Sequence, residues 1–212
     1  MDIVERYFPD LTTQQRQQLN QLPHFYHEWN ARVNLVSRQD LENLEVKHVL
    51  HSLAIARVFS FVPGAHLLDL GTGGGFPGIP LAILLPHVQF TLIDGTGKKI
   101  AVVQELIKTL SLANATALHV RAEMFRQRHA FDFVVSRAVA PLQQLLLWSQ
   151  PLLRKKHQHA YPNGLIALKG GDLASEINAL SGKSRDYVEI FAVQDFFPEP
   201  AFEEKWIVYV QG

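Results

Sequence analysis

The segment from His66 to Gly78 constrains the fold of this chain more than any other. It reads His-Leu-Leu-Asp-Leu-Gly-Thr-Gly-Gly-Gly-Phe-Pro-Gly, an apolar stretch that ends in an acidic residue and a glycine-rich turn. A strand followed by such a turn and a helix lies at the carboxyl edge of an open α/β sheet, where these folds bind ligands. Glycine permits positive φ and close approach of the backbone to a ligand. The segment therefore predicts a nucleotide-type cofactor site.

The spacing of the glycines distinguishes two classes of cofactor. A dinucleotide fingerprint, G-x-G-x-x-G, that begins at Gly71 requires a third glycine where this chain has Phe76. The pattern Asp-x-Gly-x-Gly-x-Gly, formed by Asp69, Gly71, Gly73 and Gly75, instead resembles the first motif of S-adenosylmethionine-dependent methyltransferases. We expect Asp69 to orient the glycine loop and the amino group of the methionine moiety.

Composition excludes several classes of protein. The 212 residues are 47% hydrophobic and 19% charged, which is typical of a globular chain with a sizeable core. Cysteine is absent from the sequence, so disulfides and thiolate metal sites are excluded. No stretch approaches the roughly 20 apolar residues of a membrane span, and the first residues do not resemble a signal peptide. We expect a cytoplasmic protein that makes no membrane contact.

The formal net charge of +0 argues against a protein that coats nucleic acid without specificity, because such binding depends on many phosphate contacts. A nucleic-acid enzyme with local positive charge remains possible. The basic run at 154–159, Arg-Lys-Lys-His-Gln-His, lies in an expected loop. It is either such a local contact or a solvated surface turn.

From about residue 66 the chain alternates between expected strands and helices. Two further strands then follow without a helix between them, and their spacing suits an antiparallel pair. We expect an α/β fold of the class I S-adenosylmethionine-dependent methyltransferase type, with a Rossmann-like, mostly parallel seven-stranded sheet and an antiparallel last strand. The expected strands are 66–70, 88–93, 116–120, 131–136, 164–168, 188–193 and 205–210, and the expected helices are 79–85, 98–110, 141–153 and 172–180, the last capped by Asp172.

Residues 1–60 have a different pattern. Thr12 and Gln15 form a possible capping box, and apolar residues recur after it at helical spacing. A second helix is expected over about 41–59. We interpret 1–60 as an N-terminal helical extension packed on a methyltransferase domain, 61–212, in a single structural unit.

Polar residues follow the other strands at the same edge of the sheet. Asp94 ends the second strand, where an acidic residue accepts hydrogen bonds from ribose hydroxyls or simply opens a turn. Ala122 and Glu123 follow the third strand, near an expected adenine edge. Arg137 follows the fourth strand, where it could hold a phosphate or a base oxygen, and Lys169 has a similar place after the fifth.

His48 and His51 lie three residues apart on one expected helix, a spacing that can bind a metal ion. The sequence offers no obvious third ligand. We therefore predict no metal and favour a structural or substrate-contacting role for both.

Taken together, these segments resemble the bacterial 16S ribosomal RNA guanine-N7 methyltransferases, the RsmG or glucose-inhibited division protein B family. The resemblance runs in order over about 25–172, and its most distinctive part is Phe-Pro-Gly-Ile-Pro-Leu-Ala at 76–82. The other matching pieces include Trp29-Asn30, Asn34-Leu35, His48, Ser52-Leu53, Gly71, Gly73, Asp94, Lys98-Lys99, Arg121 to Glu123, Phe131-Asp132, Ser136 to Ala138 and Lys169-Gly170.

The resemblance implies methyl transfer from S-adenosylmethionine to N7 of one guanine in the decoding-region loop of 16S rRNA, within the small ribosomal subunit. S-adenosylhomocysteine is then the product. His51 stands where the family's His-x-x-Asp-Ser pattern has Asp, which leaves the role of that carboxylate open. Carried over by position, the expected cofactor-binding residues are Gly71, Gly73, Asp94, Ala122 and Glu123, with Asp69, Gly75, Phe76 and Arg137 beside them, and the residues expected to face the RNA are Asn34, His48, Arg137 and Lys169.

Three alternatives remain open from the sequence. A nicotinamide-dependent oxidoreductase can begin with the same strand, glycine turn and helix, although Phe76 disfavours it. A ribosome-assembly factor can keep a cofactor pocket without catalysis. A methyltransferase of a small molecule or protein is also compatible with the neutral charge. We expect a monomer that acts on the assembled subunit rather than on free RNA.

Overall fold

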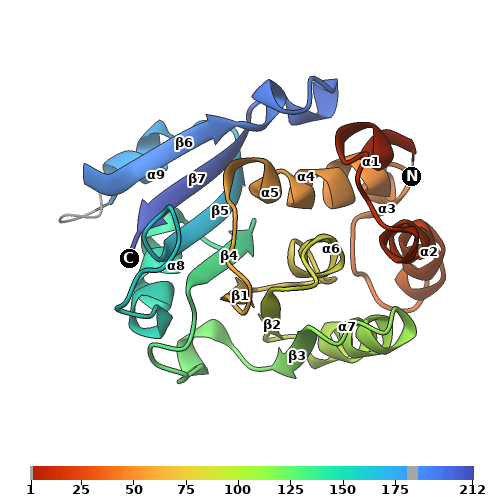
Figure 1. The fold of residues 1–212 in the computed structure, drawn as a ribbon, viewed down its shortest axis with the longest axis horizontal. Helices are drawn as coiled ribbons and strands as arrows, with labels where there is room; N and C mark the ends of the chain where they lie inside the picture. The colour runs from red at the N-terminus through yellow and green to blue at the C-terminus, as the bar shows by residue number, and fades with distance from the viewer. Residues whose placement is uncertain (1, 181–185) are drawn as a thin grey trace.

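The computed structural model describes residues 2–180 and 186–212, and Figure 1 shows their arrangement. One seven-stranded sheet crosses these residues in the order β3-β2-β1-β4-β5-β7-β6. Neighbouring strands are parallel except at β7, which runs antiparallel to β5 and to β6. The predicted seven-stranded sheet with an antiparallel last strand is thus confirmed. The strands are β1 (His66–Leu70), β2 (Gln89–Asp94), β3 (Ala115–His119), β4 (Phe133–Arg137), β5 (Gly164–Gly170), β6 (Val188–Ala192) and β7 (Lys205–Gln211).

Alternate residues of the strands pack against helices on opposite faces of the sheet, as the period of two in a strand requires. In β1, Leu67 belongs to one apolar cluster and Leu68 to the other. The first cluster includes the N-terminal helices, α6 (Gly78–Leu84) and α7 (Gly97–Thr109), and the second includes α8 (Leu142–Ser149) and α9 (Ala174–Asn178). Figure 1 shows these two helical layers on either side of the sheet. Within the described residues, no helix combines the length and apolar character of a membrane span.

The helices expected over 141–153 and 172–180 are both shorter in the structure, as α8 (Leu142–Ser149) and α9 (Ala174–Asn178). The helix expected over 141–153 ends at Ser149 and continues as a 3-10 turn, η3 (Gln150–Leu152). Pro151 lies in that turn, and proline disrupts a helix interior because it has no N–H to donate. The prediction that Asp172 caps α9 is wrong, because α9 begins at Ala174 and its N-cap residue is Leu173; Asp172, one residue earlier, accepts a hydrogen bond on Oδ1 from the N–H of Ala174 at 2.8 Å.

The N-terminal segment consists of α1 (Asp2–Tyr7), α2 (Thr13–Asn30) and α3 (Arg38–Leu41), followed by a longer helical run. The predicted capping box of α2 is confirmed, because the side chains of Thr12 and Gln15 each accept a hydrogen bond from the other's backbone N–H. The Gln15 amide also donates to the carbonyls of Ile83 and Leu84, which join α2 to the last turn of α6. The extension is therefore packed on the sheet domain.

The helix expected over 41–59 has three pieces, namely η1 (Glu45–Leu50), α4 (His51–Leu53) and α5 (Ile55–Val58). The first piece is π-helical, a form that is rare in general and frequent at functional sites. It places Lys47 and His48, with the following His51, along one cavity. The departure from regular helix therefore occurs where the extension meets the candidate site.

Candidate functional site

A cavity of about 760 Å³ opens at the carboxyl ends of β1, β2, β4 and β5, the edge where the sequence predicted a site. Its walls come from the glycine loop after β1, from η1 and α4, and from the loops after β4 and β5. The polar residues that line it are Asp40, Lys47, His48, His51, Thr72, Asp94, Lys99, Arg137, Lys169, Glu203 and Lys205. Most of the residues singled out in the sequence thus meet at one place.

Asp69 fixes the conformation of the glycine loop from the side that faces the core. It is fully buried, and its Oδ2 accepts hydrogen bonds from Thr72 Oγ1 at 2.6 Å and from the N–H of Gly78 at 2.8 Å. These two bonds join the start of the loop to the start of α6. Burial raises the pKa of this carboxyl to about 7, although the hydrogen bonds from Thr72 and Gly78 oppose the shift. Asp69 does not line the cavity, so it orients the loop from beneath.

The glycines of the loop serve different purposes. A Cβ on Gly71 would lie 2.4 Å from a methyl carbon of Val139, and one on Gly75 would lie 2.8 Å from Ile79, so both are required by packing. Gly73 has a φ of +57°, and a Cβ at this position would have no atom within 4 Å. The backbone of Gly73 is therefore open to the cavity. Asp94 Oδ2 accepts a hydrogen bond from the N–H of Gly73 at 2.9 Å, which brings this carboxylate to the loop.

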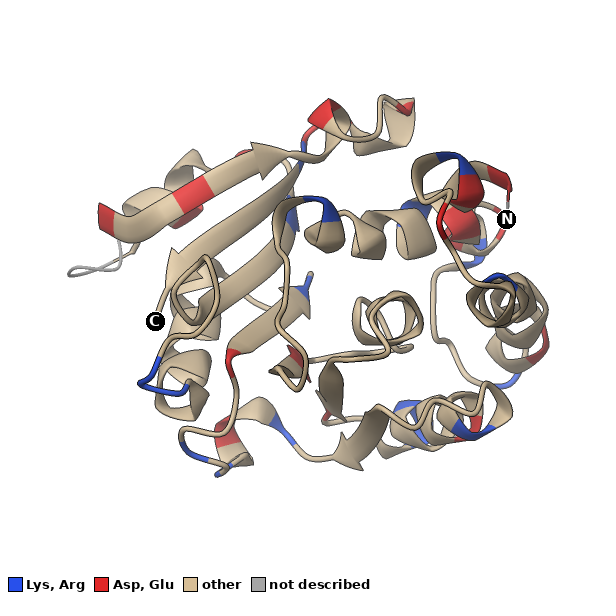
Figure 2. Cartoon of the chain, viewed as in Figure 1, with Lys and Arg blue, Asp and Glu red and all other residues tan. Residues whose placement is uncertain are grey.

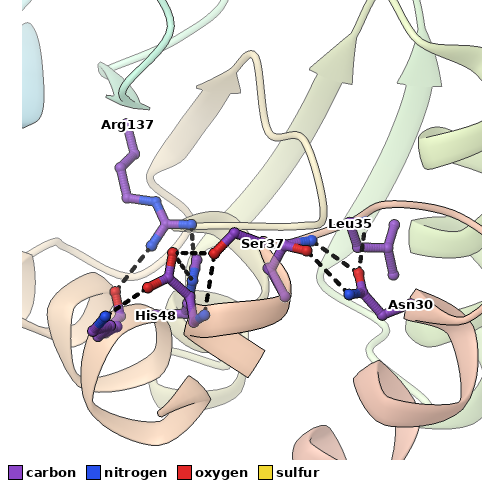
Figure 3. A network of polar contacts seen from close by, with 8 residues as sticks. Asn30, Leu35, Ser37, His48 and Arg137 are labelled. Carbon is purple, nitrogen blue, oxygen red and sulfur yellow. Dashed lines mark hydrogen bonds and ion pairs between the residues drawn. The ribbon is translucent and has the colours of Figure 1, made fainter. Parts of the chain in front are cut away.

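Arg137 joins the end of β4 to the helical extension, as Figure 3 shows. Its Nη2 donates to His48 Nδ1 at 2.7 Å, and its guanidinium lies over the ring of Phe76 at 4.9 Å. Burial lowers the pKa of Arg137 to about 10, so it stays cationic at neutral pH. Phe76 in turn stacks on Tyr26 with the ring centroids 4.9 Å apart. Phe76 is 1% exposed and thus forms a platform under Arg137 rather than a free surface for a base.

His48 is held as a neutral imidazole. Burial first, and the charge of Arg137 second, lower its pKa to about 3. Because Arg137 donates to Nδ1, the neutral ring carries its hydrogen on Nε2, which is buried and has no hydrogen-bond partner among the described residues. Asp40 Oδ2 lies 3.9 Å from that nitrogen. His51 has a pKa that burial also lowers to about 3.

Lys169 is tied to the loop after β4. Its Nζ donates to the carbonyl of Ala140 at 2.7 Å and lies 2.7 Å from Glu176 Oε2. The same carboxylate oxygen accepts from the N–H of Leu142 at 2.8 Å. The loop it secures contains Ala138, whose φ of +53 is a strained value for a residue with a Cβ. Lys169 lines the cavity, but its charge is compensated.

Five predicted residues do not line the cavity, namely Asp69, Gly75, Asn34, Ala122 and Glu123. Asn34 is exposed, and its neighbour Leu35 faces the site instead. Ala122 and Glu123 lie on a 3-10 turn after β3, η2 (Ala122–Met124), where Glu123 pairs with Arg121 at 3.8 Å. Within residues 2–180 and 186–212, no group of three or more potential ligands is arranged to hold a metal ion.

Sequence reasoning missed the residues that support the site from the extension. Tyr26 donates its hydroxyl to the carbonyl of Gly74 at 2.5 Å, and Asn30 holds the 34–36 turn through the N–H groups of Leu35 and Val36 (Figure 3). The available signal was an asparagine in the last turn of the expected helix, since Asn30 is the final residue of α2 and directly precedes its C-cap, Ala31. Asp40 could not be recognised as a site residue from the sequence, because its partner Lys47, whose Nζ lies 2.7 Å from Asp40 Oδ1, belongs to another element.

We predict that Asp69→Asn changes the pH dependence of stability. The folded-state pKa is raised, so the folded wild-type protein binds a proton that the unfolded chain releases, and stability is lost as pH rises from about 4 toward 7. Between about pH 5 and pH 8 the wild type should lose about 2.6 kcal/mol relative to the variant. Urea unfolding at several pH values measures this difference. Parallel pH profiles for the two proteins would contradict it.

Comparison with known proteins agrees with the resemblance found in the sequence. The model of the GidB family, rRNA small subunit methyltransferase G, matches residues 15–191. Ribosomal RNA small subunit methyltransferase G of Bacteroides thetaiotaomicron is 49% identical over 100% of both chains, and that of Porphyromonas gingivalis is 47% identical over 99% of this chain and 92% of its own.

Solved structures with the same fold are more distant. A SAM dependent methyltransferase from Aquifex aeolicus has a TM-score of 0.53 at 14% identity and covers 79% of this chain and 92% of its own. M. jannaschii TYW2 in complex with AdoMet has a TM-score of 0.54 at 14% identity and covers 85% of this chain and 77% of its own. These two likenesses show the class I methyltransferase fold. With the family model matched over most of the length, the chain belongs to the GidB family, rRNA small subunit methyltransferase G.

Proposed function

We propose that this protein transfers a methyl group from S-adenosylmethionine to N7 of a guanine in the decoding-region loop of 16S rRNA. Family membership makes it an rRNA methyltransferase of the small subunit, and the nicotinamide alternative is set aside on the same ground. The guanine N7 atom and the decoding-region loop rest on the resemblance and on the chemistry of the cavity. We further propose that it is a cytoplasmic monomer.

The protonation states around the cavity favour N7 as the acceptor. Guanine N7 presents an in-plane lone pair and no proton, so its methylation requires no general base. His48 and His51, with pKa values of about 3, are poor proton acceptors. Asp69, whose pKa is near 7, lies outside the cavity and is occupied by the loop. The cavity is therefore suited to a nucleophile that arrives without a proton to lose.

Positioning is then the main contribution of the chain. Holding two reactants in an attack geometry can supply about 7–11 kcal/mol of the barrier. The observation that best supports this role is the cationic Arg137, fixed on one side by His48 and from below by Phe76. We assign Arg137 to the phosphate or the base edge of the target and His48 to its orientation. Lys169 secures the adjoining loop, and Asn34 contributes from the exposed turn.

The residues present fit the methyl donor. When bound, S-adenosylmethionine supplies a methyl group on a positively charged sulfur. We assign the open surface of Gly73 and the adjoining Gly71 to the amino-acid part, and the Asp94 carboxylate to the ribose hydroxyls. Ala122 and Glu123 are assigned to the adenine edge from beyond the cavity wall. Asp69, Gly75 and Phe76 support the loop from within the core, and Arg137 borders the donor as well as the target.

The experiment that tests this function is methyl transfer from labelled S-adenosylmethionine to small ribosomal subunits that lack the modification. Digestion and nucleoside mass spectrometry identify the product, and fragment mapping locates it. We expect 7-methylguanosine within the decoding-region loop. Another methylated nucleoside, or label at another position, would refute the assignment. Protein-free 16S rRNA as a parallel substrate tests the expectation that the assembled subunit is preferred.

We predict that Arg137→Ala lowers methyl transfer far more than cofactor binding. Loss of the guanidinium should reduce kcat/KM for the subunit about 100-fold, because misplacement of a reactant is costly, while the Kd for S-adenosylmethionine changes less than about threefold. Titration calorimetry and initial rates measure the two effects. Arg137→Lys keeps the positive charge but loses the planar guanidinium that can donate two parallel hydrogen bonds. Thermal unfolding of both variants controls for folding. Equal losses in binding and transfer would defeat the assignment.

A further inference from the structure

The charge of this chain is distributed unevenly along its length. Over residues 124–171 there are seven Lys and Arg and a single acidic residue, Asp132, although the whole chain has 20 of each sign. Arg137 and Lys169 belong to the cavity at the carboxyl ends of the strands. The other five cations of this stretch are Arg126, Arg128, Arg154, Lys155 and Lys156.

The structure gathers these five cations at the opposite edge of the sheet. The segment before β4 and the segment before β5 are joined by backbone hydrogen bonds, from the N–H of His129 to the carbonyl of Pro151 at 3.1 Å and from the N–H of Arg154 to the carbonyl of Phe131 at 2.7 Å. Both segments therefore lie at the amino ends of their strands. Figure 2 shows the blue residues of the two loops close to each other at the lower left.

The acidic residue within this stretch does not compensate the loop charges. Asp132 is fully buried, and its Oδ2 accepts from Arg154 Nη1 and from the N–H of His66, both at 2.8 Å. Arg154 is thereby neutralised. Glu123, just before the stretch, pairs with Arg121.

Four exposed cations remain, and we name them the basic edge, Arg126, Arg128, Lys155 and Lys156. Arg126 Nη1 donates to the backbone carbonyl of Glu123 at 2.6 Å, which leaves its charge uncompensated. Arg128, Lys155 and Lys156 make no ion pair with any residue in the described part of the chain.

The basic edge and the catalytic cavity lie at the two ends of the same strands. A strand rises about 3.3 Å per residue, so β4 and β5 separate the two sites by about 20 Å. A short target loop cannot reach both. A folded RNA can, because its phosphates extend over tens of ångströms around a loop.

We propose that the basic edge binds the phosphate backbone of rRNA outside the target loop while the target guanine occupies the cavity. The inference rests on the proposed function and adds a second contact to it. Exposed lysines and arginines without acidic partners supply the sequence-independent part of nucleic-acid binding through the release of counterions. Residues 124–171 carry six more positive than negative charges and the rest of the chain six more negative than positive ones, so an enzyme of net charge +0 can still hold RNA at one edge.

The test compares two double variants that remove the same charge. Lys155→Gln/Lys156→Gln removes two cations of the basic edge, and Arg6→Gln/Lys108→Gln removes two exposed cations from α1 and α7. The readouts are the Kd for protein-free 16S rRNA and for assembled subunits at several salt concentrations, kcat/KM for methyl transfer, and the Kd for S-adenosylmethionine.

We expect the basic-edge variant to bind both RNA substrates about 10-fold more weakly at physiological salt, with a salt slope lower by about 1.4–1.8 and unchanged cofactor binding. The control variant should match the wild type. An equal loss in both variants, or none in either, would overturn the proposal. A loss for assembled subunits alone would indicate a protein contact and would also overturn it. Wild-type RNA binding without methyl transfer would refute the proposed function, while the affinities of the two variants would still decide the basic edge.

Discussion

The cation of Arg137, held between a neutral imidazole and an aromatic ring, is the interaction on which the site depends. The guanidinium extends from the end of β4, donates a hydrogen bond to His48 Nδ1, and lies over the ring of Phe76. Phe76 belongs to the glycine loop and stacks on Tyr26 of the N-terminal extension. One residue therefore connects the sheet, the loop and the extension. The same enclosure lowers the pKa of His48 to about 3, and it leaves Arg137 as a fixed positive charge in the wall of the cavity.

The sheet was predictable because its signals are local. In the first strand, Leu67, Leu68 and Leu70 place apolar side chains on both faces, which is typical of a strand with a helical layer on each side, and the glycine turn that follows marks the ligand edge. The antiparallel placement of β7 followed from the missing crossover helix. The boundaries that shifted did so for local reasons too, as at Pro151, which replaces the end of α8 with a 3-10 turn.

The support of the site was less predictable because it depends on contacts between distant residues. No pattern in α2 announces that the Tyr26 hydroxyl reaches the carbonyl of Gly74, 48 positions away. Lys169 was expected at the end of the fifth strand, but its ion pair with Glu176 could not be foreseen. Because of that pair Lys169 is not a free cation, and its side chain stabilises the neighbouring loop. Asp69 occupies the expected strand end, and its burial explains why it organises the loop without facing the cavity.

The central claim is that the cavity positions a nucleophile that has no proton to lose, and the pH dependence of the chemical step tests it most directly. Single-turnover rates of methyl transfer, with enzyme in excess over subunits and with saturating S-adenosylmethionine, isolate that step from binding. The account predicts a rate that is flat from about pH 6 to about pH 8.5, since His48 and His51 stay neutral and Arg137 stays charged throughout. Asp69, whose pKa is about 7, titrates in this range from within the core, so Asp69→Asn is measured beside the wild type. A rate that rises tenfold per pH unit through an apparent pKa in that range in both proteins would demonstrate a general base in the cavity and contradict the account.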